Sequence, residues 1–436
     1  HLSPLDHPTR SAAGCGRGPG TTTGFMRNQW LKLMALCVTT LPLLPSAGES
    51  ATTRRDEVAS VLPITELQTW MNEAGVPGVS ITVIRDFEIH WTLAFGKADA
   101  SSQRPVTTTT LFQAASISKP VMAVATAVLA DQGQLDLDGD VAIFLRSWDM
   151  PSLPEGVSPA ITPRMLLSHT SGLADGLGFP GYRPSEALPD TLSILNGVPP
   201  AKTVAIRPGF APMSQSRYSG GGSVVMQQLL MDVTGRTFPD LMRTKLLQPL
   251  GMLQSTYQQP LDASRRHAAA LAHDIRGQRI DVPWMVYPEL AAAGLWSTSE
   301  ELAALIRSLQ RTAAGDAVKP LSRTLVRDLW RPVGVGSFSS GFQVFQQGEG
   351  WYFAHMGANR GFRSFLMAHQ SKGYGLVVMT NGDGGEQLIE RICRRIQEFY
   401  DWDVQEKEGQ FRFSPQRGLG CLPEVGSTET RPSTSG

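Results

Sequence analysis

The sequence lacks an excess of either charge, because 39 lysine and arginine residues balance 39 aspartate and glutamate residues. Proteins that bind nucleic acid or anionic membranes through their overall field usually carry a basic excess. The balance therefore argues against both as partners. Apolar residues make up 41% of the chain, which supplies a large core and excludes a mostly disordered protein.

Cysteine is scarce, and its spacing excludes further kinds of site. The four cysteines are Cys15, Cys37, Cys393 and Cys421, and no two of them form a C-x-x-C pair. A zinc ribbon or a thioredoxin-type site is therefore not predicted. Cys393 lies in an apolar helical stripe, which favours a buried thiol over a disulfide with Cys421.

Several motifs with well-known chemistry are absent. The sequence contains no G-x-S-x-G, no H-E-x-x-H, no P-loop and no G-x-G-x-x-G that opens a helix. Its eight histidines are scattered along the chain rather than clustered. The sequence therefore predicts neither a metal ion nor an organic cofactor.

The N-terminal region is expected to be removed from the mature protein. Residues 1–25 do not begin with Met and are interpreted as upstream sequence or residues added by cloning. From Met26, a basic start precedes an apolar run over 31–44 and then small residues, as is typical of a secretory signal peptide over 26–48. The mature chain would begin near residue 49 and be secreted or periplasmic. The alternative is an apolar N-terminus without a role in export.

Hydrophobic periodicity predicts an α/β (α+β) fold with strands near both ends of the mature chain. Two β-rich runs at 79–84 and 88–95 indicate a hairpin, and helical patterns dominate the middle of the chain. Helices are expected at 64–75, 116–132, 161–168, 223–235, 239–247, 298–311 and 385–402, and further strands at 342–346, 351–356, 361–369 and 374–380.

This order of elements predicts an antiparallel sheet that is flanked by helices and completed by the C-terminal part of the chain. The α/β part would comprise about 60–115 and 300–402, and a mostly helical domain would be inserted between them at about 116–299. Residues 403–436 are polar and rich in glycine, proline, serine and threonine, which indicates a tail.

A serine and a lysine three residues apart are the strongest candidates for chemistry. Ser116 and Lys119 open a predicted helix, and their spacing places them on one face of it. A serine hydroxyl needs a neighbouring base, and a partly desolvated lysine one turn away can act as that base or tune it. The helix N-terminus also offers an N–H group to a developing oxyanion.

Further motifs follow this pair along the chain. They are SHTSGL at 168–173, Tyr218-Ser219-Gly220 before a helix, AGLWST at 293–298 and HMGANRGF at 355–362. With these motifs, residues 60–402 resemble the serine β-lactamase-related family, which includes class C β-lactamases, DD-peptidases, D-aminopeptidases and family VIII carboxylesterases. The resemblance implies a β-lactamase/transpeptidase-like fold.

The resemblance also implies roles for individual residues. Ser116 would be acylated beside Lys119, and Tyr218 would act as the general base. A tyrosine hydroxyl ordinarily titrates near pH 10, so the charge of Lys119 would have to favour the phenolate. The backbone N–H groups of Ser116 and Ala358 would form the oxyanion hole, and water would hydrolyse the acyl-enzyme.

The sequence departs from the family's motifs where the substrate is recognised. Gly220 replaces the Asn of Y-x-N, which commonly binds the substrate's amide, and His355 replaces the Lys of K-T-G, which meets a β-lactam carboxylate. Both changes favour a carboxylesterase of short-chain esters with weak β-lactam hydrolysis, because an ester needs less leaving-group protonation than an amide. Arg360 is a candidate replacement for the missing charge, which keeps a class C-like β-lactamase open.

Other functions also remain open. An H-x-G motif occurs in DD-peptidases and D-aminopeptidases of the family, so His355 does not exclude peptide substrates. A catalytically silent penicillin-binding or scaffold protein is the alternative without enzyme activity, although the presence of Ser116, Lys119 and Tyr218 argues against it. The oligomeric state does not follow from the sequence.

The residues expected to line the substrate site surround these motifs. They are His355, Gly357, Asn359, Arg360 and Gly220. His169 is expected to make a structural hydrogen bond in its turn rather than to act in catalysis. The long loop over 174–215, which includes Phe179, either walls a substrate pocket or is a surface insertion without substrate contact.

Overall fold

The structure is a computed structural model that describes residues 51–151, 160–173, 178–348 and 350–402. Several predictions therefore lie outside the described residues: the leader at 1–25, the signal peptide at 26–48, the tail at 403–436, and Cys15, Cys37 and Cys421. Within the described ranges, no helix combines the length and the apolar character that crossing a bilayer requires.

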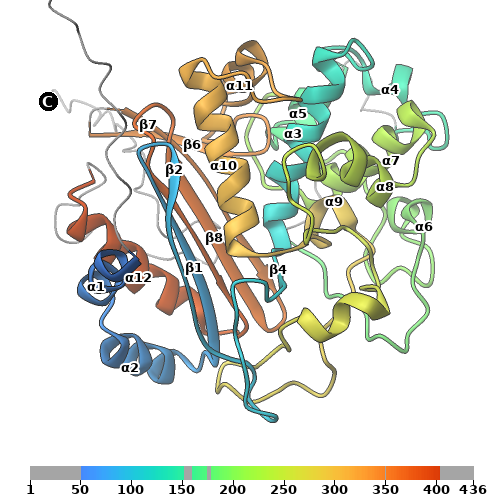
Figure 1. Cartoon of the computed structure of the whole chain (residues 1–436). Coiled ribbons are helices and arrows are strands. Elements are labelled where there is room, and N and C mark those ends of the chain that lie inside the picture. The colour runs from blue at the N-terminus through green and yellow to red at the C-terminus, as the bar shows by residue number, and fades with distance from the viewer. Residues whose placement is uncertain (1–50, 152–159, 174–177, 349, 403–436) are drawn as a thin grey trace, which may run out of the picture. The chain divides into compact units, whose positions relative to one another are not determined.

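One antiparallel sheet joins the two ends of the described chain (Figure 1). Its strand order is β3-β2-β1-β9-β8-β7-β6, so the predicted N-terminal hairpin β1–β2 pairs through β1 with β9 from the C-terminal part. This arrangement confirms the predicted fold class. The strands are β1 (Gly78–Arg85), β2 (Glu88–Asp99), β3 (Arg104–Pro105), β6 (Gln343–Gln347), β7 (Gly350–Asn359), β8 (Phe362–His369) and β9 (Gly375–Thr380).

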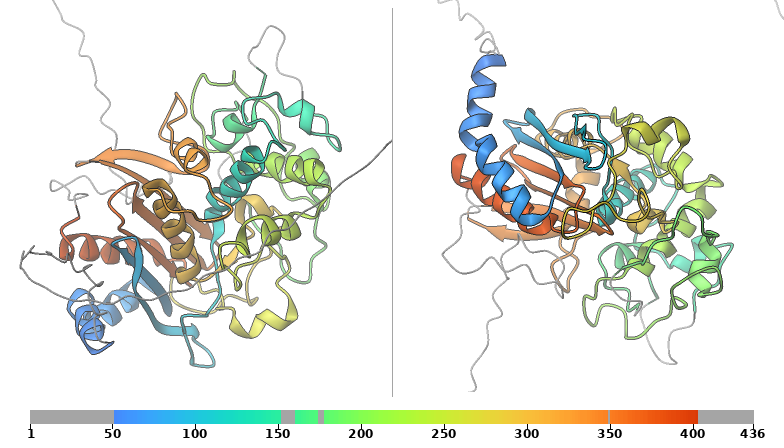
Figure 2. Two further views of the ribbon diagram at one scale, coloured as in Figure 1. Left: turned by 45° about the horizontal axis from the view of Figure 1, so that its top comes forward. Right: turned by 90° about the horizontal axis from the view of Figure 1, so that it is seen from below.

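Helices cover both faces of the sheet because its central strands are apolar on both sides. In β9, Leu376 and Val378 belong to one core, whereas Val377 and Met379 belong to the other. The first face is covered by α1 (Ala51–Val61), α2 (Ile64–Ala74) and α12 (Gly385–Phe399), and the second by α10 (Ser299–Ala314) (Figures 1 and 2).

Helix α12 presents a fully buried apolar stripe to the sheet. The stripe consists of Leu388, Ile389, Ile392, Cys393 and Ile396. Cys393 is therefore buried as expected. Because Cys421 lies outside the described residues, the preference for a thiol over a disulfide stays a prediction.

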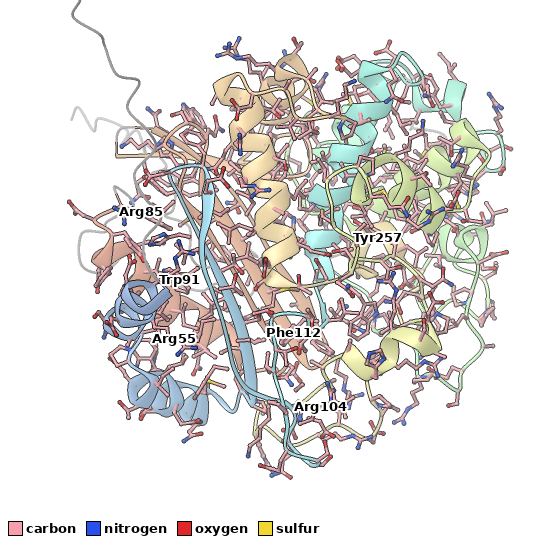
Figure 3. All side chains as sticks on the ribbon, in the orientation of Figure 1. Arg55, Arg85, Trp91, Arg104, Phe112 and Tyr257 are labelled. Carbon is pink, nitrogen blue, oxygen red and sulfur yellow. The ribbon has the colours of Figure 1, made fainter. Side chains whose placement is uncertain are left out.

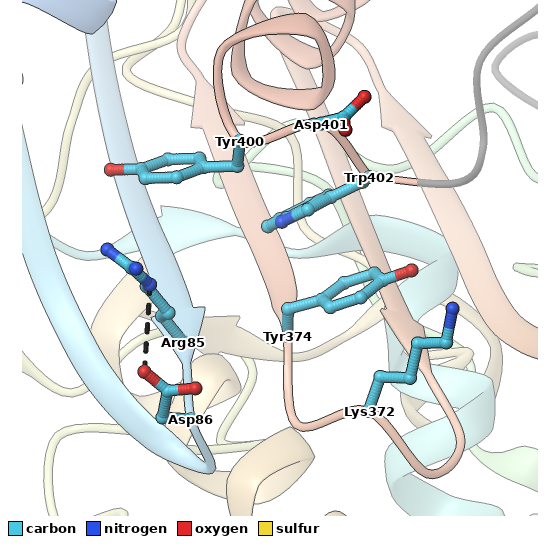
Figure 4. A pocket seen from close by; sticks show the side chains of 7 residues that line it. All are labelled: Arg85, Asp86, Lys372, Tyr374, Tyr400, Asp401 and Trp402. Atoms are coloured by element: carbon cyan, nitrogen blue, oxygen red, sulfur yellow. Dashed lines mark ion pairs between the residues drawn. The ribbon is translucent and has the colours of Figure 1, made fainter.

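An aromatic stack holds the end of α12 against the sheet. The rings of Tyr374 and Trp402 stack with centroids 4.6 Å apart, and those of Trp402 and Tyr400 with centroids 6.1 Å apart. The guanidinium of Arg85, at the end of β1, lies 5.7 Å from the centre of the Tyr400 ring. Figure 4 shows these side chains around the pocket that they line with Lys372. None of them belongs to the predicted active site, so we assign the stack to anchoring the C-terminal end of the fold.

Helices connected by long irregular segments lie between the two parts of the sheet. In α3 (Ser118–Asp131), every residue from Ser118 to Leu129 is buried, which explains its nearly continuous apolar sequence. The other helices of this region are α4 (Val141–Phe144), α5 (Pro163–Leu167), α6 (Thr191–Asn196), α7 (Gly220–Thr234), α8 (Phe238–Met242) and α9 (Leu290–Ala293), and α11 (Arg323–Leu329) follows α10.

The helices of this region differ from their predicted bounds by a few residues: α3 begins at Ser118 after a 3₁₀ turn, and α5 spans Pro163–Leu167 rather than 161–168. Helix α7 begins at Gly220 rather than at residue 223, because the Ser219 hydroxyl caps it by accepting a 2.8 Å hydrogen bond from the Gly222 N–H. The glycines at its start have low helix propensity, so the sequence did not indicate that the helix begins there. The predicted helix 239–247 is α8 followed by a π-helical turn over Arg243–Leu247.

A short two-stranded sheet positions the start of α3. Strand β4 (Phe112–Gln113) pairs with β5 (Trp296–Ser297), and the Ala114 N–H donates to the Leu295 carbonyl at 2.8 Å. Figure 3 shows Phe112 where the large sheet meets the helical elements. The Tyr257 hydroxyl, also labelled there, donates to the Ser118 carbonyl at 2.7 Å. These contacts hold the chain on both sides of Ser116.

A buried carboxyl group lies immediately before α9. Glu289 has no exposed surface, and neither of its carboxylate oxygens has a hydrogen-bond partner among the described residues. Burial raises the pKa of Glu289 to about 7, because an uncompensated charge is unfavourable in the protein interior.

Replacing Glu289 by Gln should remove one destabilising contribution to the pH dependence of stability. The unfolded chain releases this proton near its ordinary pKa of 4.5 and the folded chain near 7, so stability falls as pH rises through this interval. The loss amounts to roughly 3 kcal/mol above pH 8. Urea unfolding of the wild type and of Glu289→Gln at about pH 5 and about pH 8.5 measures it.

Glu300→Gln is the matched control, because Glu300 is exposed on α10. It should keep the wild-type change in stability between the two pH values, to which the buried histidines contribute in the opposite sense, because their pKa values are lowered. Relative to wild type, Glu289→Gln should gain roughly 3 kcal/mol in that change. An equal change in wild type and Glu289→Gln would show that this carboxyl group does not titrate as its burial requires.

Candidate active site

A strained turn presents Ser116 between β4 and α3. Residues Ala115–Ile117 form a 3₁₀ turn, and Ala115 has a φ of 50°, in the left-handed region that non-glycine residues rarely adopt. Such strain persists only where the surroundings hold it, and it is frequent at functional sites. Here Ser118 holds the turn: its hydroxyl donates to the Ala115 carbonyl at 2.5 Å and accepts from the Leu295 N–H at 3.0 Å.

The side chain of Lys119 turns back from the first turn of α3 onto Ser116. It is 3% exposed, and its Nζ donates to the Ser116 Oγ at 3.1 Å and to the Ala292 carbonyl at 2.8 Å. The two side chains thus share one face, as their spacing predicts. The carbonyl from α9 directs the ammonium toward the hydroxyl.

Tyr218 joins this pair from the segment before α7. The Lys119 Nζ lies 4.9 Å from the centre of the Tyr218 ring. Tyr218, which is distant in sequence, is thereby brought to the Ser116–Lys119 pair, as the motifs predict. The roles of Ser116 as nucleophile and of Tyr218 as base stay predictions.

His169 holds Tyr218 from both sides. Its carbonyl accepts a hydrogen bond from the Arg217 N–H at 2.8 Å, and its Nδ1 accepts one from the Ser219 N–H at 3.2 Å. The rings of His169 and Tyr218 lie 4.4 Å apart. Burial, together with the charge of Lys119, holds the pKa of His169 well below its usual value, so the ring is neutral. The structural hydrogen bond expected of His169 is confirmed.

Strand β7 approaches the Ser116 turn so closely that it needs a glycine. A Cβ on Gly357 would lie 2.2 Å from the Ala114 carbonyl oxygen and 2.4 Å from the Ser364 Oγ. The Ser364 hydroxyl in turn donates to that carbonyl at 2.8 Å. Gly357 therefore packs the strand against the turn, and Ala358 follows it as an exposed residue. The oxyanion hole proposed from Ser116 and Ala358 stays a prediction.

His355 is a neutral imidazole at the position of the motif lysine. It is 1% exposed, and its Nδ1 is 2.6 Å from the Met356 carbonyl oxygen. Burial, and then the charge of Lys119, lower its pKa to about 3. The fixed positive charge of K-T-G is thus absent from this position at neutral pH.

Asn359 and Arg360, at the end of β7, differ in their contacts: Asn359 is buried and hydrogen-bonded, whereas Arg360 is half exposed. The Asn359 Nδ2 donates to the Gln113 Oε1 at 2.8 Å and to the Ala293 carbonyl at 3.1 Å, so it ties β7 to β4 and α9. The Arg360 guanidinium is half exposed and lies 4.0 Å from the Asp281 carboxylate. Binding of substrate by either residue stays a prediction.

Gly220 leaves no room for the asparagine of the Y-x-N motif. A Cβ at this position would lie 2.7 Å from the Phe179 Cε2. Phe179 comes from the loop expected either to wall a pocket or to form a surface insertion, and it packs against the start of α7. The edge of the Phe179 ring therefore lies beside Gly220, where the Y-x-N motif would have a side-chain amide.

Sequence reasoning missed groups that support the site without a motif of their own. The Ala292 carbonyl is a main-chain acceptor, which no pattern of residue types marks. Phe338 packs its ring 4.7 Å from that of His169 and 5.9 Å from that of Tyr218. It lies in a glycine- and serine-rich stretch without hydrophobic periodicity, so no signal indicated it.

Comparison with known proteins gives a family and several relatives. The family model described as Beta-lactamase matches residues 64–398. Protein flp of Staphylococcus aureus (strain N315) is 22% identical over 333 residues, and the match covers 75% of this chain and 64% of that protein. The chain thus spans less than two thirds of the length of that relative.

Other relatives carry names of different activities. Esterase EstB of Burkholderia gladioli is 32% identical over 191 residues, covering 42% of this chain and 47% of that protein. Penicillin-binding protein 4 of Amycolatopsis lactamdurans is 26% identical over 345 residues, covering 74% and 86%. The crystal structure of SurE with D-Leu superposes with a TM-score of 0.63 at 22% identity, covering 82% of this chain and 78% of that one, and shows that the fold is shared.

Replacing His169 by Ala should loosen the segment that carries Tyr218. The variant loses the acceptor for the Ser219 N–H and places alanine at a φ of 60°, so the free energy of unfolding should fall by about 1–3 kcal/mol. Amide hydrogen exchange at residues 217–219 should accelerate at least about tenfold.

His169→Asn is the matched variant, because asparagine tolerates the left-handed region and offers an acceptor oxygen. It should recover much of the lost protection. If His169→Ala leaves exchange at Arg217 and Ser219 unchanged, His169 does not hold this segment.

Proposed function

The chain belongs to the β-lactamase family, and on that basis we propose that it is a serine hydrolase that forms an acyl-enzyme on Ser116. We further propose that it acts as a carboxylesterase on short-chain esters, with weak β-lactam hydrolysis as a side activity. The observation that carries the proposal is the Lys119 ammonium, buried and 3.1 Å from the Ser116 hydroxyl.

In the proposed first step, Tyr218 takes the proton of Ser116. Because Lys119 already donates to the Ser116 oxygen as an ammonium, it cannot accept that proton in the same state. Its charge near the Tyr218 ring instead favours the phenolate. The Ser116 oxygen then attacks the ester carbonyl carbon, and the carbonyl oxygen becomes the oxyanion that the N–H groups of Ser116 and Ala358 would stabilise.

The tetrahedral intermediate collapses when the bond to the alcohol oxygen breaks. The leaving alcohol takes the proton from Tyr218, and the acyl group stays on Ser116. In deacylation, Tyr218 removes a proton from water, the resulting oxygen attacks the acyl carbon, and the proton returns to Ser116. The net reaction adds one water and requires neither a metal nor a redox partner.

The groups around Ser116 support an uncharged ester as the substrate. His355 carries no charge at neutral pH, and the Phe179 ring replaces an amide at Gly220. The similarity to an esterase also supports this choice. A peptidase or a class C-like β-lactamase is the second candidate, because the half-exposed Arg360 guanidinium is available to a substrate carboxylate. The signal-peptide pattern supports a secreted or periplasmic location.

Parallel rate assays test the reaction and its substrate class together. The wild type should hydrolyse p-nitrophenyl butyrate with a kcat/KM at least about tenfold above those for nitrocefin and a D-alanyl p-nitroanilide, because the site lacks the charge and the amide that the latter two need. Ser116→Ala should lower every rate by roughly 10³-fold or more.

Ser60→Ala, an exposed serine on α1, is the control and should behave as wild type. Faster turnover of nitrocefin or of the D-alanyl amide would overturn the substrate class but leave Ser116 as nucleophile. A folded wild type that turns over none of these compounds would favour the silent alternative.

A further inference from the structure

Position 220 requires a glycine because of a neighbouring aromatic ring and not because of its backbone conformation. Gly220 lies in the first turn of α7, and its φ is not in the positive range that favours glycine. A Cβ would instead meet the Phe179 ring, at 2.7 Å from Cε2 and 3.2 Å from Cζ. The ring therefore occupies the space that a longer side chain at 220 would fill.

The segment that carries Phe179 is firmly anchored. Tyr182 and Val286 exchange backbone hydrogen bonds of 2.8 and 2.7 Å. At Gly181, a Cβ would lie 2.9 Å from the Met285 Cβ and 2.9 Å from the Tyr287 Cζ. The backbone at Gly181 therefore packs directly against the side chains of Met285 and Tyr287. This packing holds Phe179 in place and makes it part of the scaffold.

Phe179 packs both against the large core and against a small separate apolar cluster. The cluster consists of Met285, Tyr287 and Ala293. It borders the end of β7, because the Ala293 carbonyl accepts from Asn359 at 3.1 Å and the Tyr287 hydroxyl accepts from the Arg360 N–H at 3.1 Å. Phe179 thus connects the Tyr218 side of the site with its β7 side.

We propose that Phe179 is the specificity-determining residue of this site and that it selects esters of apolar, uncharged carboxylic acids. The inference rests on the proposed esterase function and specifies which acyl groups the enzyme would accept. The ring rests on the buried side chains of Met285 and Tyr287 and is itself only partly buried, so the surface it leaves exposed is apolar and offers no hydrogen bond. An acyl group that carries an amide loses its hydrogen bonds to water against this surface, which typically costs about 10- to 100-fold in kcat/KM.

Two esters of equal shape and the same leaving group isolate this effect. p-Nitrophenyl 4-methylpentanoate is the hydrocarbon counterpart of p-nitrophenyl N-acetylglycinate, in which the amide N–H and C=O replace a CH₂ group and a CH group with one of its methyl groups. Each kcat/KM is divided by the rate of the same ester with hydroxide, which removes the difference in intrinsic reactivity. Ser116→Ala supplies the background. The wild type should favour the 4-methylpentanoate by at least about tenfold.

Variants at Phe179 and at Gly220 then distinguish the effect of the ring from the effect of the glycine. Phe179→Ala should lower this preference about tenfold by losing turnover of the apolar ester. Phe179→Ala with Gly220→Asn should reverse the preference, because the cavity left by the ring admits an amide side chain that can pair with the acyl amide. Gly220→Asn alone should lose activity on both esters, because the ring collides with the new side chain.

Phe399→Ala, a half-exposed phenylalanine of α12, is the control and should keep the wild-type preference. If Phe179→Ala fails to fold, Phe179→Leu, which keeps an apolar side chain without the ring, should show an intermediate preference. An unchanged preference in a folded, active Phe179 variant overturns the inference while the proposed function stands. Absence of Ser116-dependent turnover of both esters in the wild type overturns the proposed function itself.

Discussion

The ammonium of Lys119 lies between the Ser116 hydroxyl at 3.1 Å and the Ala292 carbonyl at 2.8 Å, and the surrounding elements hold it there. A cation buried to this degree needs acceptors, because an unpaired charge in the interior is far more unfavourable than a neutral group. Helix α9 supplies the carbonyl and is itself fixed by the Gln227 Oε1, which accepts from the Ala291 N–H at 2.9 Å. A shift of α9 would therefore remove the ammonium from the hydroxyl.

The groups around this cation are neutral, and this gives the site its chemical character. Burial first and the Lys119 charge second lower the pKa values of His169 and His355, so neither ring adds a competing positive charge near neutral pH. On the other side of the site, Phe179 and its apolar neighbours replace a hydrogen-bonding group. These neutral groups beside the cation and the hydroxyl support the proposal that the site acts on an uncharged ester.

Sequence patterns predicted those features that depend on residue type at a regular spacing. The sheet strands alternate or run apolar, and the S-x-x-K spacing brings Ser116 and Lys119 onto one face, as found. Features set by tertiary contacts were not predictable. Ala115 adopts a left-handed φ that only its surroundings impose. Helix α9 is too short to show hydrophobic periodicity. The contact between Phe179 and Gly220 joins two residues that are far apart in sequence, and no local pattern indicates that they are close.

The most direct test of the central claim, that Ser116 is the nucleophile, is mass spectrometry of the protein after reaction with a fluorophosphonate, which phosphonylates an activated serine and releases fluoride. The account predicts one adduct for each chain, located on the peptide that contains Ser116 and absent from a folded Ser116→Ala variant. A folded wild type that stays unlabelled, or an adduct on a different residue, would contradict the assignment of Ser116 as the nucleophile.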